Sequence, residues 1–216
     1  MKIINPSYEI ITPIDGGEIL KTIERVARTC YKSENLITDS SAQKMVAALV
    51  KSGHTAMIEF ADIIVRFQCD IGFYKDLTRH RMASFAIEST RWCNYGGDKF
   101  GNELKIIRPV NIKEGTPEYE IWKRAMEDIE TAYLEMSKLG CAADQLRMLL
   151  PHSTAAEVNV KANLREWRHI FSLRAIGHAH PSIKQLLRPL CREFASKIPV
   201  VFDDLAKQIE EEDAKA

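Results

Sequence analysis

Polar and apolar residues alternate along residues 62–69. Ile63, Val65 and Phe67 fall on one face of an extended chain, whereas Asp62 and Arg66 fall on the other. Because successive side chains of a strand point to opposite faces, this pattern predicts a half-buried strand. Other segments with extended patterns between turn residues are residues 3–12, 84–95 and 104–110.

Apolar residues spaced three and four apart predict helices over much of the remaining chain. Asp39 and Ser40 are capping residues before one such stretch, and Thr116-Pro117 begins the longest, which Gly140 ends. The helical stretches are residues 19–27, 41–53, 71–81, 117–140, 144–150, 163–177 and 182–197. Since the few strands lie in the first half, the sequence predicts an α+β fold with a helix-rich C-terminal half.

Composition narrows the class of protein. The chain has 216 residues, 45% of them hydrophobic, with 30 basic against 30 acidic side chains. This length suits a single domain over residues 1–216, and the hydrophobic fraction excludes wholesale disorder. The formal net charge of zero disfavours nucleic acid as the main partner, because proteins that bind phosphates usually carry a basic excess. No apolar run approaches the roughly 20 residues that span a membrane, and no signal peptide is evident, so we expect no membrane partner and a cytoplasmic location. The five scattered cysteines include no CxxC pair, which disfavours a disulfide framework or structural zinc.

One cluster of candidate chemistry is Arg79-His80-Arg81, followed by Ser89 and Arg91. On an extended chain Ser89 and Arg91 share a face, and a hydroxyl beside a guanidinium suits a phosphate, because Arg offers a planar fork of donors. The alternative is a solvated basic surface patch, since most charged residues are exposed.

A second cluster runs from Asn163 to Arg174. Arg165 and His169 lie four residues apart and so share a helical face. The alternative is a solvent face of ion pairs around Glu166, with Trp167 in the core. His178 and His180 lack nearby cysteines or paired carboxylates, so we expect no metal site. Arg147, alone among apolar neighbours, either reaches solvent or meets an anion.

At these residues a resemblance to a known family appears. The stretch RHRMASFAIESTRWCNY resembles the signature of the flavin-dependent thymidylate synthases, Arg-His-Arg followed after seven residues by Ser. NLREWRHIFSLRAIGHAHP, with LRMLLP before it, is similar to the second conserved region of that family, and SGHTAMIEF to the segment before the signature. Three segments in the same order are far more specific than one triplet.

The resemblance implies an activity and partners. Members of the family convert dUMP to dTMP, with 5,10-methylenetetrahydrofolate as carbon donor, NADPH as reductant and noncovalently bound FAD as hydride carrier. They are homotetramers with active sites shared between subunits, built on a curved, mostly antiparallel sheet flanked by helices. Reduced flavin takes part directly, so no nucleophile from the enzyme is implied.

The resemblance also implies roles for individual residues. Arg174, against the uracil, and His54, near flavin and folate, are the implied catalytic residues. The implied cofactor contacts are Ala56, Arg79, His80, Arg81, Ile87, Asn163, Arg165 and His169. The implied substrate contacts are Asp76, Arg79, Glu88, Ser89, Thr90, Arg91, Arg147 and Arg174. Ile87, Ala56, Phe60 and Asp76 depart from the family pattern by losing or shortening a polar side chain, whereas the arginines are all present.

Two other functions fit parts of the sequence. One is a single-stranded nucleic-acid or nucleotide-binding module that uses the same arginines with Trp92 and Tyr95 for stacking. The other is a related flavoenzyme that acts on a different pyrimidine nucleotide, which the departures at Ile87 and Asp76 permit.

Overall fold

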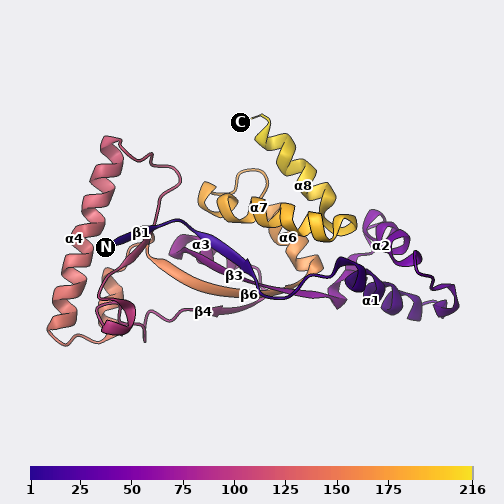
Figure 1. Ribbon diagram of the computed structural model, residues 1–216, viewed down its shortest axis with the longest axis horizontal. Coiled ribbons are helices and arrows are strands. Elements are labelled where there is room, and N and C mark those ends of the chain that lie inside the picture. Colours follow the sequence, from indigo (N-terminus) through magenta and orange to yellow (C-terminus); the bar gives the residue numbers. More distant parts are fainter. Residues whose placement is uncertain (216) are drawn as a thin grey trace. The chain divides into compact units, whose positions relative to one another are not determined.

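The computed structural model describes residues 1–215 and confirms the α+β class with a helix-rich C-terminal half (Figure 1). The helices are α1 (Gly16–Thr29), α2 (Ser41–Lys51), α3 (Ile71–Leu77), α4 (Pro117–Lys138), α5 (Ala143–Leu146), α6 (Leu164–Arg174), α7 (Pro181–Lys197) and α8 (Pro199–Asp213). The 3₁₀ helices are η1 (Glu34–Leu36), η2 (Thr55–Phe60), η3 (Asp98–Phe100) and η4 (Arg147–Leu149). The strands are β1 (Lys2–Ile4), β2 (Ser7–Ile10), β3 (Asp62–Asp70), β4 (Ser84–Ile87), β5 (Lys105–Ile107) and β6 (Ala155–Asn163).

The strands form two sheets. β1 and β5 pair in parallel, with Ile3 opposite Ile106, and β2, β3, β6 and β4 form an antiparallel sheet in that order. The alternation at residues 62–69 thus belongs to β3, whose residues Ile63, Val65 and Phe67 are fully buried as predicted.

The chain divides into two compact units, each made of several segments. Unit 1 comprises Met1–Tyr8, Arg66–Arg79 and Phe85–Asn159. Unit 2 comprises Glu9–Val65, His80–Ser84 and Val160–Ala216. The sequence-based assignment of one domain over residues 1–216 stays a prediction.

Unit 2 is built around aromatic side chains from α6, α7 and α8. The rings of Trp167 and Phe171 stack with centroids 5.6 Å apart, and Phe194 meets both edge-on. The indole of Trp167 donates a hydrogen bond to the carbonyl of Ile63 at 3.1 Å, so its one polar group is satisfied in the core. Asn163 caps α6 by accepting from the amide of Glu166 at 2.9 Å, which fixes where that helix begins.

Unit 1 has its own core beside the long helix α4. Tyr95, Leu104, Met126, Tyr133 and Leu146 belong to one buried apolar cluster. The hydroxyl of Tyr133 accepts from the amide of Tyr95 at 3.2 Å, and α4 begins at the predicted Thr116-Pro117 cap. The loop that follows the signature motif is therefore anchored on α4.

Two local predictions around the signature motif are wrong. The helix predicted over residues 71–81 ends at Leu77, so Arg79, His80 and Arg81 lie beyond α3 in turns rather than fanning around a helix. The extended segment predicted over residues 84–95 ends at Ile87. The carbonyl of Ser89 accepts from the amides of Trp92 at 3.0 Å and Cys93 at 2.9 Å, which closes a turn, so Ser89 and Arg91 do not share a strand face.

Other element boundaries differ as well. The predicted strand over residues 3–12 is split into β1 and β2 around Pro6, which has no amide hydrogen for a strand ladder. The segment predicted as helix over residues 144–150 contains the short α5 and then η4. β6 and α8 were not predicted. Among the described residues, no helix combines the length and the apolar character needed to cross a membrane.

Gly16 marks a close approach inside unit 2. A β-carbon at Gly16 would lie 2.0 Å from the backbone carbonyl oxygen of Lys197, at the end of α7. Since backbone yields less readily than a flexible side chain, Gly16→Ala should lower the free energy of unfolding by about 1–3 kcal/mol. Gly17→Ala is the matched control, because a β-carbon there meets only the Asp15 carboxylate, at 3.3 Å. Urea unfolding compares the variants, and equal midpoints would contradict the prediction.

Candidate functional site

The two motifs singled out in the sequence meet in unit 2. His80 comes from the signature, and Glu166, His169 and Arg174 come from α6. His80 Nδ1 lies 3.1 Å from Glu166 Oε1, and Arg174 Nε donates to His80 Nε2 at 3.3 Å. The rings of His80 and His169 meet edge-to-face, with centroids 5.3 Å apart. Residues more than eighty positions apart in the sequence thus form one polar cluster.

The hydrogen bonds determine the state of His80. A guanidinium has no acceptor, so His80 Nε2 must be the acceptor of the bond from Arg174. The proton of the neutral ring is then on Nδ1, where it is donated to Glu166. Burial lowers the pKa of His80 below its usual value, and the opposing hydrogen bond and charge of Glu166 do not reverse this. The imidazole is therefore neutral near pH 7.

Three side chains of this cluster lie close enough together to hold a metal ion: His80, Glu166 and His169. Each offers one ligand atom, and these atoms lie within 4.8 Å of one another. The hydrogen bonds described above already account for both nitrogens of His80, and the charge of Arg174 opposes a second cation beside it. His180, which raised the question of a metal in the sequence, accepts from the amide of Ser182 at 3.3 Å and caps α7.

The segment around His54 belongs to the same unit. His54 and Ala56 are exposed at the beginning of η2, which packs against α6. Glu59 accepts from Arg165 at 2.6 Å. Both implied catalytic residues, His54 and Arg174, are therefore in unit 2. Six of the implied cofactor contacts are there as well: Ala56, His80, Arg81, Asn163, Arg165 and His169. The other two, Arg79 and Ile87, belong to unit 1. Arg81 and His169 are exposed, whereas Asn163 serves as the helix cap.

The predicted phosphate-binding residues belong to unit 1. Ser89 and Arg91 are exposed around the turn that follows β4, and Arg79 is exposed after α3. Arg147 is exposed in the first position of η4, which supports the reading that it reaches solvent or an anion rather than packing in the core. Asp76 and Thr90 are partly buried in the same unit.

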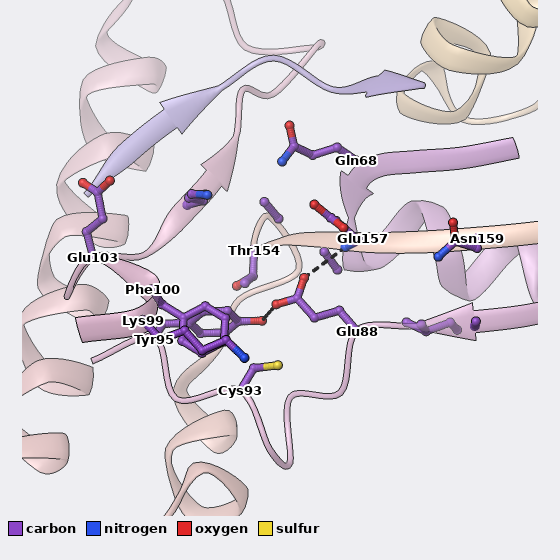
Figure 2. Close-up of a pocket in the computed structure, with 15 residues that line it drawn as sticks. Gln68, Glu88, Cys93, Tyr95, Lys99, Phe100, Glu103, Thr154, Glu157 and Asn159 are labelled. Carbon is purple, nitrogen blue, oxygen red and sulfur yellow. Dashed lines mark hydrogen bonds between the residues drawn. The ribbon is translucent and has the colours of Figure 1, made fainter. Parts of the chain in front are cut away.

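Unit 1 also contains a cavity of about 570 Å³, shown in Figure 2. Of the predicted site residues, Ile87 and Glu88 line it. The Glu88 carboxylate accepts from the Tyr95 hydroxyl at 2.7 Å and from the Glu157 amide at 3.1 Å (Figure 2). The hydroxyl of Thr154 is buried in the lining and has no hydrogen-bond partner among residues 1–215. Glu88 thus has a structural role inside its own unit.

Glu166 is the member of the polar cluster that sequence reasoning missed. The sequence gives it no role in the site and names it only in the alternative interpretation, a solvent face, yet only 8% of it is exposed. The available signal was weak. Glu166 shares α6 with His169 and Arg174, but its partner His80 lies 86 positions away, so no local spacing pointed to the pair.

Residues 16–200 match the family model described as thymidylate synthase complementing protein. The flavin-dependent thymidylate synthase of Corynebacterium glutamicum is 28% identical over 212 residues, which cover 89% of this chain and 81% of that protein. The enzyme of the same name from Pyrococcus furiosus is 27% identical over 185 residues, covering 82% of this chain and 75% of that protein.

Solved structures show the same fold. A UMP/dUMP methylase, PolB of Streptomyces cacaoi, bound with 5-Br dUMP, aligns with a TM-score of 0.76 and 21% identity over 94% of this chain and 96% of that one. Thymidylate synthase X of Helicobacter pylori, with FAD and dUMP, aligns with a TM-score of 0.74 and 16% identity over 94% of this chain and 99% of that one. Since the family model matches most of the chain, this protein belongs to the thymidylate synthase complementing protein family, that of the flavin-dependent thymidylate synthases.

Proposed function

We propose that this protein catalyses the FAD-dependent reductive methylation of dUMP to dTMP, with 5,10-methylenetetrahydrofolate as carbon donor and NADPH as reductant. The observation that carries the proposal is the hydrogen bond from Arg174 to His80, which joins the signature motif to the second conserved region across 94 positions of sequence. These two stretches resemble the conserved motifs of the family, and the relatives that match over most of the chain are named flavin-dependent thymidylate synthase.

The side chains of unit 2 fit a flavin cofactor in their chemistry. FAD presents a pyrophosphate and ring carbonyls, which are acceptors, and exposed Arg81, Arg165, His169 and His54 are donors. These residues and Asn163 would hold the cofactor. When bound, FAD supplies the redox chemistry, because side chains offer no hydride carrier. The Helicobacter pylori relative with the same fold was solved with FAD.

The arginines would have two roles toward the nucleotide: some would bind its phosphate, and one would activate its uracil ring. Arg79, Arg91 and Arg147, with the hydroxyl of Ser89, would bind the phosphate, since guanidinium groups match its geometry. Arg174 would lie against the uracil and stabilise negative charge that develops on the ring, which raises electron density at C5. The protein needs no basic excess for this, because its arginines are concentrated locally while its net charge is zero.

The visible spectrum and a turnover assay test the proposal together. The purified protein should show a flavin absorption band that NADPH bleaches without oxygen, and it should form dTMP from dUMP only with methylenetetrahydrofolate present. A colourless protein that binds oligonucleotides would instead favour the nucleic-acid alternative. PolB of Streptomyces cacaoi, which has the same fold, is named a UMP/dUMP methylase, so UMP is tested in the same assay, together with dCMP. If UMP or dCMP is methylated faster than dUMP, that nucleotide becomes the proposed substrate in place of dUMP.

The proposal includes a cytoplasmic homotetramer whose active sites are shared between subunits. A chain that depends on its neighbours for a complete site should lose FAD when it dissociates. Sedimentation equilibrium with absorbance at the flavin band measures mass and cofactor together. A monomer that retains full FAD binding would contradict the shared site, while leaving the proposed reaction open to the turnover assay.

A further inference from the structure

We propose that Glu166 is a positioning residue for Arg174 and acts through His80. In this arrangement the carboxylate holds the imidazole, and the imidazole holds the guanidinium in the orientation that meets the uracil. The inference rests on the proposed function, because Arg174 has its role at the uracil only if dUMP is the substrate. Glu166 itself touches neither substrate nor cofactor in this proposal.

The burial of the pair is the first argument. His80 is 5% exposed and Glu166 is 8% exposed, and their side chains lie 3.1 Å apart. A buried carboxylate is costly unless it is hydrogen-bonded to a partner, and His80 is that partner. Asn163 fixes the amide of Glu166 at the beginning of α6, where a negative charge is also favoured by the helix dipole. Glu166 is therefore held at its backbone amide by Asn163 and at its carboxylate by His80.

The direction of the hydrogen bonds is the second argument. Arg174 can only donate, so the chain of bonds has one consistent order: Arg174 Nε to His80 Nε2, then His80 Nδ1 to Glu166. Glu166 selects the tautomer that leaves a lone pair on Nε2. Without the carboxylate, the other tautomer would place a proton on Nε2, facing the donor of Arg174, and the bond between them would be lost.

The point at which Arg174 is held is the third argument. His80 accepts from Nε, the nitrogen at which the guanidinium joins the rest of the side chain. A bond at Nε limits rotation of the planar group about the long side chain, and Arg otherwise has many rotamers. Because catalytic rates depend steeply on placement, loss of this bond should reduce turnover more than it weakens nucleotide binding.

Substitutions at Glu166 test the proposal through kinetics. Glu166→Ala should lower kcat for dTMP formation by roughly 10- to 10²-fold with little change in the KM for dUMP. Glu166→Gln keeps an acceptor oxygen for His80 Nδ1 and should recover most of the rate. In an Arg174→Lys background, Glu166→Ala should cost less than about twofold, since residues that act through one another are not additive. Full additivity would overturn the proposal.

A matched control is Asp204 of α8, an acidic partner of the same helix α6. Asp204 accepts two hydrogen bonds from Arg168 of α6, at 2.7 Å and 2.6 Å, and has no place in the chain of bonds through His80. Asp204→Asn therefore removes an acidic partner of α6 and should leave kcat unchanged. If Asp204→Asn lowered kcat as much as Glu166→Ala, the effect would be one of helix stability, and the positioning role would be excluded.

A spectroscopic measurement separates this proposal from the proposed function. In ¹⁵N-labelled protein, the Nε–H of Arg174 should give a resonance protected from exchange with water, assigned by its absence in Arg174→Lys. Glu166→Ala should abolish that protection and Glu166→Gln should retain it. Unchanged protection in Glu166→Ala would overturn the proposal whatever the enzyme does. A wild-type protein that forms no dTMP but shows this coupling would instead refute the proposed function alone.

Discussion

Arg174→Lys should depress dTMP formation by roughly 10²-fold or more while reduction of the flavin by NADPH survives. Lys keeps the positive charge but loses the planar fork of donors and the Nε–H that is donated to His80 at 3.3 Å. An interaction that strengthens as charge develops on the uracil lowers the barrier itself, and loss of one such donor has this scale of effect.

Stopped-flow measurement of the two half-reactions distinguishes this from simple binding loss. The flavin band of Arg174→Lys should bleach with NADPH at close to the wild-type rate, whereas single-turnover dTMP formation should be slow even at saturating dUMP. A variant that forms dTMP at the wild-type rate, or one that no longer holds FAD, would remove Arg174 from the role of uracil-activating residue.

Trp167→Ala should lower the free energy of unfolding by about 3–5 kcal/mol, the usual scale for removing a buried large aromatic side chain. Trp167 is fully buried between Phe171 and Phe194, and its indole also satisfies the carbonyl of Ile63. The substitution leaves a cavity and removes that hydrogen bond at once.

The same helix supplies the control for this prediction. Leu173 is 53% exposed, so Leu173→Ala should change stability by no more than about 0.5 kcal/mol. Urea titrations of both variants, followed by circular dichroism, give the comparison. A Trp167→Ala midpoint equal to that of Leu173→Ala would show that this aromatic cluster contributes little to the stability of unit 2.

Elements with a strong local signal could be predicted from the sequence. The alternation in β3 and the Thr116-Pro117 cap of α4 depend on neighbouring residues alone, and the structure confirms them. Ser40 does precede α2, but its side chain makes no capping hydrogen bond there, so the predicted cap of α2 is wrong. β6 was missed although Ala156, Val158 and Val160 are buried at alternate positions. Alanine has little preference for strands, so this alternation was weak against its helical surroundings.

The candidate site was harder to predict because its bonds are non-local. The resemblance brought His80 and Arg174 together, but spacing could not reveal that Glu166 turns toward His80 rather than toward solvent. Likewise, the turn at Ser89 depends on bonds from amides three and four residues further along the chain, and β propensity gives no sign of these bonds. Side-chain chemistry was readable from the sequence, whereas the direction of each side chain was not.

The discontinuity of unit 2 has a consequence for synthesis on the ribosome. Unit 1 ends at Asn159, so all its segments can exist before α6 is made. α1 and α2 are translated early, yet α2 packs on α8, and α1 begins beside the end of α7. α1 and α2 also pack on each other, but their contacts with α7 and α8 must wait for more than a hundred further residues. Until then, the parts of α1 and α2 that these C-terminal helices cover in the finished chain stay exposed, and such transient apolar surface makes a nascent chain prone to aggregation.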